Sequence, residues 1–218
     1  MSVRREMRGF AVGSLLFALG ATPGYVGLVG VTADNVTYFL GSIFFTIAGF
    51  TQLRLTGRWR RGGWASKEAW DDWWAAAIQF VGTLAFNVST FFAIAGNLDP
   101  GLFDNLVWRP DFVGSVCFIV ASVLAARATT HRESLWDPEA RNGWNTWINL
   151  AGALFFMVSA VFSWVNPSTG DPISTDMTNL GTFAGAVCFF VAALLLKPGN
   201  PGGRPSAAHP GPTANGRV

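Results

Sequence analysis

Few side chains of this sequence could do chemistry in an apolar environment, and most of those are amides. Gln79, Asn87 and Asn149 each lie inside a long apolar stretch. An amide at such a position either forms a hydrogen bond to a neighbouring helix or lines a polar path. The sequence leaves both roles open, so we treat these three residues as a candidate polar centre.

No group of residues has the spacing of a catalytic or metal centre. His131 and His209 are isolated in polar stretches, with no second ligand at metal-binding spacing. Cys117 and Cys188 lie in apolar stretches, which favours packing over a disulfide. No phosphate-binding loop or Ser-His-Asp arrangement is apparent. We therefore predict a protein that is not an enzyme and has no cofactor or metal.

The remaining charged candidates stand at the ends of apolar stretches. Asp71 and Asp72 come at the expected start of a helix, where a carboxylate stabilises the helix dipole. Arg109 is the one basic residue among acidic neighbours and stands beside Asp111. A local ion pair explains Arg109 better than an anion site does.

The elements that must position these residues are membrane-spanning helices. Only 13% of the 218 residues are charged, against about 25% in soluble domains. Six apolar segments approach the length that crosses a bilayer of about 30 Å, and in hydrocarbon such segments must be helical. These segments are residues 10–31, 37–53, 73–96, 112–128, 147–165 and 179–196.

The basic residues predict the orientation. Apart from Arg109, they all fall before the first segment, after the sixth, or in alternate loops between segments. The other loops hold Asp34, Asp99, Asp104, Asp171 and Asp176. Basic loops stay in the cytoplasm, so both termini are predicted to be cytoplasmic. As an alternative, residues 1–21 resemble a signal peptide whose removal would leave five spans.

A pattern of Gly, small residue, aliphatic residue, any residue and Phe recurs with a period near seventy residues. A Gly followed by a small residue lets two helices approach closely in lipid, and the Phe one turn later lies on the same face. We expect helix packing at these glycines, which are Gly13, Gly41, Gly82, Gly114, Gly152 and Gly185.

The repeat predicts an all-α bundle of six transmembrane helices, built from three parallel helical hairpins. The hairpins cover about residues 10–53, 73–128 and 144–196, and together they form one domain, 1–196. In the first hairpin, Pro23-Gly24 is expected to bend the helix. Residues 197–218 are rich in Pro, Gly, Ala and Ser and are predicted to be a disordered cytoplasmic tail.

The sequence NVTYFLGSIFF (35–45) resembles the core of the YrhK-like domain, a small bacterial membrane module. Its signature is an aromatic residue and aliphatic residues before Gly-Ser-aliphatic-x-Phe. The stretches WRPDFVGSVCF (108–118) and GTFAGAVCF (181–189) resemble it less closely. Compact members of that family have two helices, so three hairpins depart from the basic form. The resemblance implies a membrane location but no catalytic or ligand residues.

Two hypotheses of function follow. The abundance of small residues and the lack of ionisable groups in mid-span favour a non-enzymatic module whose hairpins pack together or bind a partner. The alternative is a transporter or channel for a small solute or ion, with its polar centre near Gln79, Asn87 and Asn149. In both cases we expect a multi-pass protein of the bacterial plasma membrane. Its partners would be the lipid bilayer and another copy or membrane protein, not nucleic acid.

Overall fold

The computed structural model describes residues 3–56, 67–96, 98–129 and 141–196, and within them the chain is helical apart from turns and one isolated β-bridge between Val165 and Pro172. The predicted tail, residues 197–218, and both histidines, His131 and His209, lie outside these residues. The helices are α1 (Val3–Gly20), α2 (Tyr25–Val29), α3 (Val31–Leu55), α4 (Lys67–Ala95), α5 (Pro100–Phe103), the π-helical turn η1 (Asp104–Trp108), α6 (Arg109–Thr129), α7 (Arg141–Phe162) and α8 (Thr175–Leu195).

The first predicted segment, residues 10–31, is not one helix. Helix α1 ends at Gly20, and the chain turns through Pro23 and Gly24 into the short α2. Gly24 has a φ of 87°, in the left-handed region that favours glycine, and Gly30 has a φ of 85° before α3. The bend expected at Pro23-Gly24 is therefore a complete break. It turns the chain back so that α3 runs beside α1.

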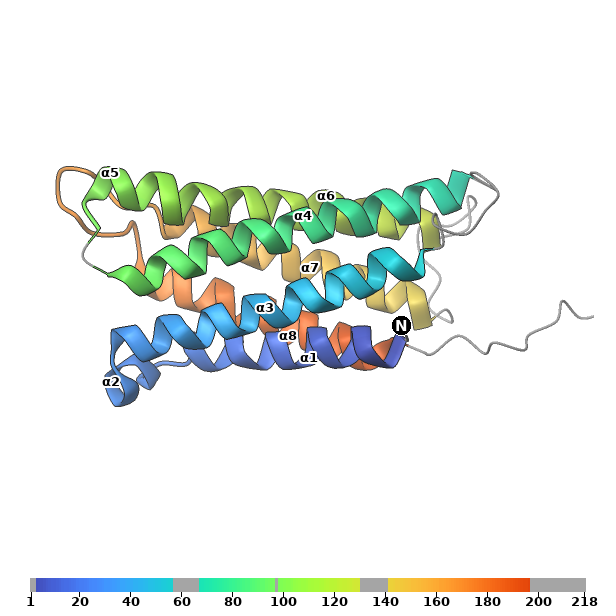
Figure 1. Ribbon diagram of the computed structural model, residues 1–218, viewed down its shortest axis with the longest axis horizontal. Helices are drawn as coiled ribbons and strands as arrows, with labels where there is room; N and C mark the ends of the chain where they lie inside the picture. Colours follow the sequence, from blue (N-terminus) through green and yellow to red (C-terminus); the bar gives the residue numbers. More distant parts are fainter. Residues whose placement is uncertain (1–2, 57–66, 97, 130–140, 197–218) are drawn as a thin grey trace, which may run out of the picture.

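The long helices lie side by side along one axis (Figure 1), and their contacts close a ring. The pairs α1–α3, α4–α6 and α7–α8 make the most extensive helix–helix contacts, and these are the three predicted hairpins. Helix α3 also packs on α4, α6 on α7, and α8 returns to pack on α1. Each long helix therefore has a neighbour on both sides, and side chains directed inward meet at a common axis.

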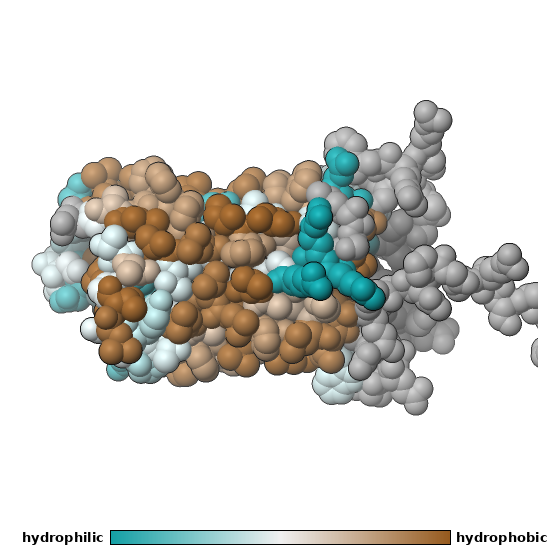
Figure 2. Space-filling model, turned by 60° about the horizontal axis from the view of Figure 1, so that its bottom comes forward, coloured by the Kyte–Doolittle hydropathy of each residue, from teal (hydrophilic) through white to brown (hydrophobic). Residues whose placement is uncertain are grey.

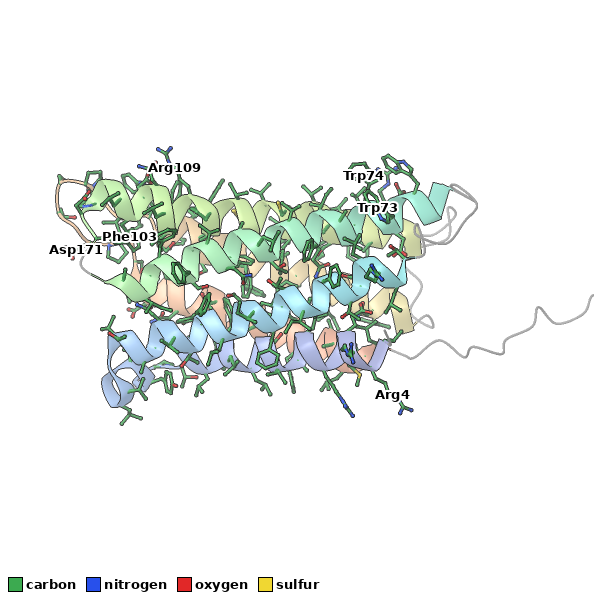
Figure 3. All side chains as sticks on the ribbon, in the orientation of Figure 1. Arg4, Trp73, Trp74, Phe103, Arg109 and Asp171 are labelled. Atoms are coloured by element: carbon green, nitrogen blue, oxygen red, sulfur yellow. The ribbon has the colours of Figure 1, made fainter. Side chains whose placement is uncertain are left out.

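The two ends of the ring differ in charge. The N-terminus lies at one end, together with the last turns of α3 and α6. This basic end carries the described arginines Arg4, Arg5, Arg8, Arg54 and Arg127. At the opposite, acidic end lie Arg109 and Asp171 (Figure 3), with the connections that also carry Asp34, Asp99, Asp104 and Asp176.

Within each hairpin the two repeated glycines face one another. A Cβ added at Gly82 would lie 3.1 Å from the carbonyl oxygen of Gly114, and one at Gly114 would lie 3.1 Å from that of Gly82. Gly13 with Gly41 and Gly152 with Gly185 give reciprocal distances between 2.9 and 3.1 Å. Real Cβ atoms are rarely this close to a carbonyl oxygen. Glycine is therefore required at these contacts for the helices to approach as they do.

Large apolar side chains cover the outside of the ring. Exposed leucine, valine and phenylalanine residues occur on every long helix, and Figure 2 shows them as a broad hydrophobic band beside hydrophilic residues at the basic end. A continuous apolar surface of this kind suits lipid rather than water. Five stretches among the described residues are long and apolar enough to cross a membrane: Val31–Leu55, Trp70–Ala95, Pro100–Arg127, Trp144–Phe162 and Thr175–Leu195. The chain thus has the helices of a multi-pass membrane protein.

Helix α1 is not among those five stretches. Its first turns carry Arg4, Arg5, Glu6 and Arg8, and its apolar part extends only from Phe10 to Gly20. The whole helix of 18 residues is about 27 Å long at 1.5 Å per residue, which approaches the thickness of the hydrocarbon core only when its charged first turns are counted.

Candidate functional site: a polar cavity inside the ring

Six phenylalanines, one from each repeated pattern, fill the middle of the ring. The three phenylalanines on the first helix of each hairpin form a triangle. Between ring centroids, Phe17 lies 5.8 Å from Phe156 and 6.4 Å from Phe86, and Phe86 lies 5.9 Å from Phe156. All three are buried. The three helices α1, α4 and α7 thus contribute one aromatic layer across the axis.

The other three phenylalanines form a second layer. Phe118 lies 5.4 Å from Phe189 and 6.4 Å from Phe45, and Phe45 lies 6.3 Å from Phe189. Within each hairpin the layers touch, with centroid distances of 5.2, 5.0 and 5.1 Å. Such tilted and edge-to-face pairs are favourable arrangements of aromatic rings. We call these six residues the Phe plug, because they close the axis.

A partly open cavity adjoins the Phe plug on the side of the basic end. It has about 310 Å³ of empty space, counted with its open mouth. Its apolar wall includes Phe10, Phe189, Ala193 and Leu196. Its polar wall is formed by Glu6, Gln52, Gln79, Asn145 and Asn149. Because these residues come from α1, α3, α4, α7 and α8, the cavity lies inside the ring rather than on its surface.

Repeat register explains why most of these residues converge. Gln79 and Asn149 each stand three residues before the glycine of their repeat, and Phe10 holds that position in the first repeat. Glu6 and Asn145 each stand seven residues before theirs. Offsets of three and seven fall on one helix face, so both positions face the axis as the Phe plug does. Gln52 reaches the cavity from the end of α3.

Most of the polar wall has no partner in the part of the chain that the structure describes. Asn145 donates a hydrogen bond from Nδ2 to the carbonyl oxygen of Ala192. Glu6, Gln52, Gln79 and Asn149 make no side-chain hydrogen bond to other described residues, and Oε1 of Gln52 is fully buried without a partner. Buried polar groups in proteins are almost always paired. The carboxyl of Glu6 and Oε1 of Gln52 therefore need water or a ligand in the cavity.

Glu6 is the charged member of the wall. Its side chain is 5% exposed, although Arg4, Arg5 and Arg8 beside it are exposed, and Arg4 points away from the bundle (Figure 3). Glu6 lies one turn before the apolar segment of α1. Burial raises the pKa of its carboxyl to about 7, and the negative charge of Asp72 adds to the rise. Ion pairs of described residues do not include Glu6.

Asn87, the third member of the predicted polar centre, does not line the cavity. Its Nδ2 donates a hydrogen bond of 2.9 Å to Oγ1 of Thr46, which joins α4 to α3. A second bond between these helices connects Ser42 and Thr90 over 3.0 Å. Asn87 comes eight residues after Gln79, which places it about 12 Å further along α4 at 1.5 Å per residue, beyond the cavity and next to Phe86 of the Phe plug. It thus has the interhelical role that the sequence left open.

The charged residues at the helix ends form ion pairs between and within helices. Helix α4 begins at Lys67, so Asp71 and Asp72 lie past its first turn and are not caps, contrary to the prediction. Asp71 instead lies 3.8 Å from Nε of Arg127 on α6. At the acidic end, Nε of Arg109 lies 2.8 Å from Oδ2 of Asp104, so the ion pair is formed with Asp104 and not with the neighbouring Asp111.

A second hollow at the acidic end has fewer features of a site. It is a wider surface depression, with about 690 Å³ of open space between Pro100, Trp108, Trp164 and Pro167. Its charged groups, Asp104 and Arg109, neutralise each other. The cavity beside the Phe plug is the better candidate, because Glu6 forms no ion pair with a described residue and Gln52, Gln79 and Asn149 form no side-chain hydrogen bond with one.

The glycines and cysteines take part in packing within the chain. Each repeated glycine contacts the other helix of its own hairpin, and Gly82 and Gly152 lie against the Cβ atoms of Cys117 and Cys188.

Sequence reasoning found Gln79 and Asn149 but missed Glu6, Gln52 and Asn145. The offset of seven residues shared by Glu6 and Asn145 could have revealed both.

No group of three or more His, Cys, Asp or Glu side chains in the described residues could hold a metal ion. In comparison with known proteins, no family model, characterised protein or solved structure matches the chain. Function must therefore be argued from the geometry of the cavity and of the Phe plug above it.

Proposed function

We propose that this chain is a six-span transporter or channel for a small polar solute, which binds in the cavity and crosses the membrane along the axis of the ring. Of the two functions considered from the sequence, this one is supported by a specific observation. Polar side chains from α1, α3, α4 and α7 meet inside the ring, and Glu6, Gln52, Gln79 and Asn149 have no hydrogen-bond partner among the described residues. A module that served only for packing has no need of them, since each unpaired buried polar group costs stability.

In this proposal α1 is the sixth span, and three parallel hairpins surround a pseudo-threefold axis. The reciprocal glycine contacts in every hairpin and the two triangles of the Phe plug support this repeat. The basic end faces the cytoplasm of a bacterium, in keeping with the positive-inside rule. The same residues, Gly41 to Phe45, carry the resemblance to the YrhK-like domain, and we retain membership of that family as part of the proposal.

The Phe plug represents the closed state of the path. Two aromatic layers without polar groups exclude water and ions, since a hydrophobic constriction dewets. Passage of a solute therefore needs the plug to open, either by tilting of the hairpins or by rotation of the rings. Because the protein moves a solute and does not transform it, we propose no enzymatic activity.

Flux through proteoliposomes tests the proposal. The purified full-length chain is reconstituted, and the uptake of K⁺, NH₄⁺, urea and glycerol is followed. Phe86→Ala removes a ring that is 1% exposed, and we expect it to increase the flux of a permeant several-fold. Gln79→Leu with Asn149→Leu is expected to reduce the same flux.

Phe155→Ala is the matched control, because Phe155 is 42% exposed on the outer surface next to a plug residue. We expect no change in flux from it. Truncation of a buried Phe costs about 3–5 kcal/mol of stability, so Phe86→Leu is included as a milder opening of the plug. Absence of flux for every solute, in the intact protein and in both Phe86 variants, would rule out a solute path.

A further inference from the structure

We propose that the cavity binds one small monovalent cation, with the Glu6 carboxylate as its counter-charge and amide oxygens of Gln52, Gln79 and Asn149 as further ligands. This inference rests on the proposed solute path, for which it specifies the ligand. It concerns binding, and therefore it can be tested apart from transport.

The first support is the charge of the site. Glu6 is 5% exposed, and the described ion pairs use Arg109 and Arg127 with other carboxylates. A carboxylate in such surroundings requires a cation or a proton, because an unpaired buried charge is costly. Arg4, Arg5 and Arg8 are exposed, and the described residues that line the cavity include no basic side chain.

The second support is the kind of atoms that face the cavity. A carboxylate and amide carbonyl groups are oxygen ligands, which hard cations prefer. Oε1 of Gln52 is buried without a donor, so it is available as an acceptor. Amide side chains from α3, α4 and α7 line the same cavity as Glu6 of α1. Such an arrangement replaces part of the hydration shell of an ion.

The number of carboxylates indicates the charge of the ligand. Among the described residues that line the cavity, Glu6 is the one acidic side chain, whereas sites for divalent cations usually combine several carboxylates. One negative charge is balanced by one positive charge. The centres of water-sized spheres can occupy about 30 Å³ of the cavity, and one water needs roughly 10–15 Å³ on that measure, so the space suits one small cation with one or two waters.

Thermal stability in different salts tests the inference. The full-length chain in detergent is heated in equal concentrations of KCl, NaCl, NH₄Cl, MgCl₂ or N-methyl-D-glucamine chloride, whose organic cation is too large for the site. Unfolding is followed by tryptophan fluorescence. We expect at least one small monovalent cation to raise Tm saturably, by roughly 5 °C over the organic cation. The separate K⁺, Na⁺ and NH₄⁺ arms distinguish an alkali ion from ammonium.

Glu6→Gln keeps the shape of the side chain and removes its charge, and we expect it to abolish the cation-dependent rise. Asp176→Asn is the matched control, since Asp176 is an exposed carboxylate at the acidic end, and it should retain the rise. Gln79→Leu gives a second variant should Glu6→Gln fold poorly, and it should reduce the rise.

Equal Tm in small and large monovalent cations, or a rise that persists in Glu6→Gln, would overturn the cation site. A larger rise in MgCl₂ than in any monovalent salt would do the same. Transport of urea or glycerol without any cation effect would leave the solute path intact and reject only the cation. Conversely, a Glu6-dependent rise without flux would retain the site and reject the path.

Discussion

At the scale of single residues, glycine sets the distance between the helices of each hairpin. An added Cβ at Gly114 would lie 3.1 Å from the carbonyl oxygen of Gly82 and 2.9 Å from Cε1 of Phe86. The backbone oxygen cannot move without moving its helix. The same contact holds a ring of the Phe plug in place, so close approach and a closed axis depend on the same position.

Gly114→Ala should therefore destabilise the protein, by about 1–3 kcal/mol for an overpacked contact. Tm in detergent, followed by circular dichroism, measures the effect. Gly27→Ala is the control, because nothing lies within 4 Å of a Cβ at Gly27. Equal Tm values for the two variants would show that the glycine contacts do not limit helix packing.

The pH dependence of cation binding should report on Glu6. Because the pKa of Glu6 is raised to about 7, a proton competes with the cation below that pH. The affinity should rise about tenfold per pH unit below the pKa and level off above it. The charge of Asp72, which does not line the cavity, also acts on Glu6. The other described polar side chains of the cavity wall are uncharged amides. Titration of the Tm rise from pH 5.5 to 8.5 measures this, and Glu6→Gln should show no such dependence.

The same residues show where reasoning from sequence succeeds and fails. Gln79 and Asn149 could be found because amides are conspicuous inside long apolar segments. Glu6 could not be found in that way, because it lies among three arginines and resembles part of a solvated basic flank. Glu6 is buried because it faces a cavity that α3, α4, α7 and α8 also line, and the packing of α8 against α1 closes the ring around that cavity. That contact joins the two ends of the chain, and local pattern carries no information about it.

At the scale of elements, polar bonds between helices add specificity to apolar packing. Asn87 to Thr46 and Ser42 to Thr90 join α4 to α3, which belong to different hairpins. Between the second and third hairpins, Nε1 of Trp108 donates to the carbonyl oxygen of Ala160 over 2.7 Å. These bonds fix the relative positions of neighbouring hairpins at interfaces that lipid could otherwise enter.

Asn87→Leu should lower Tm and leave the cavity unaffected. A double-mutant cycle with Thr46→Val should give a coupling of about 0.6 kcal/mol, the average for such bonds in membrane proteins. The cation-dependent rise in Tm should persist in Asn87→Leu, unlike in Gln79→Leu. Loss of that rise in Asn87→Leu would instead place Asn87 in the site.

The boundaries of the elements were predictable to different degrees. The second to sixth apolar segments lie within or almost within helices of the structure, because hydrocarbon leaves no alternative to a helix. The first segment was predicted as one helix to residue 31, yet α1 ends at Gly20. Apolar content alone does not distinguish one long membrane-spanning helix from a shorter one that is followed, after a turn, by a second short helix. The positive φ of Gly24, which ends the continuity, depends on a tertiary turn.

At the scale of the whole molecule, the arrangement of charge predicts the orientation. The basic and acidic ends are separated by the length of the ring (Figure 1). A reporter inserted after Ser168, in the turn between α7 and α8, should be active only outside the cytoplasm. A reporter fused after Leu196 should be active only inside. Green fluorescent protein and alkaline phosphatase provide the two readouts, and activity of one reporter at both positions would refute the topology.

The position of Glu6 has a consequence for how such a ring can be made. In the proposed repeat, the residues equivalent to Glu6 are Ala75 and Asn145. An assembly of three separate, identical hairpins would place the same side chain at all three positions. Three carboxylates around one axis would repel one another and favour protonation or a multivalent ion. Joining the hairpins in one polypeptide removes that constraint, so that a threefold scaffold can hold a solitary negative charge.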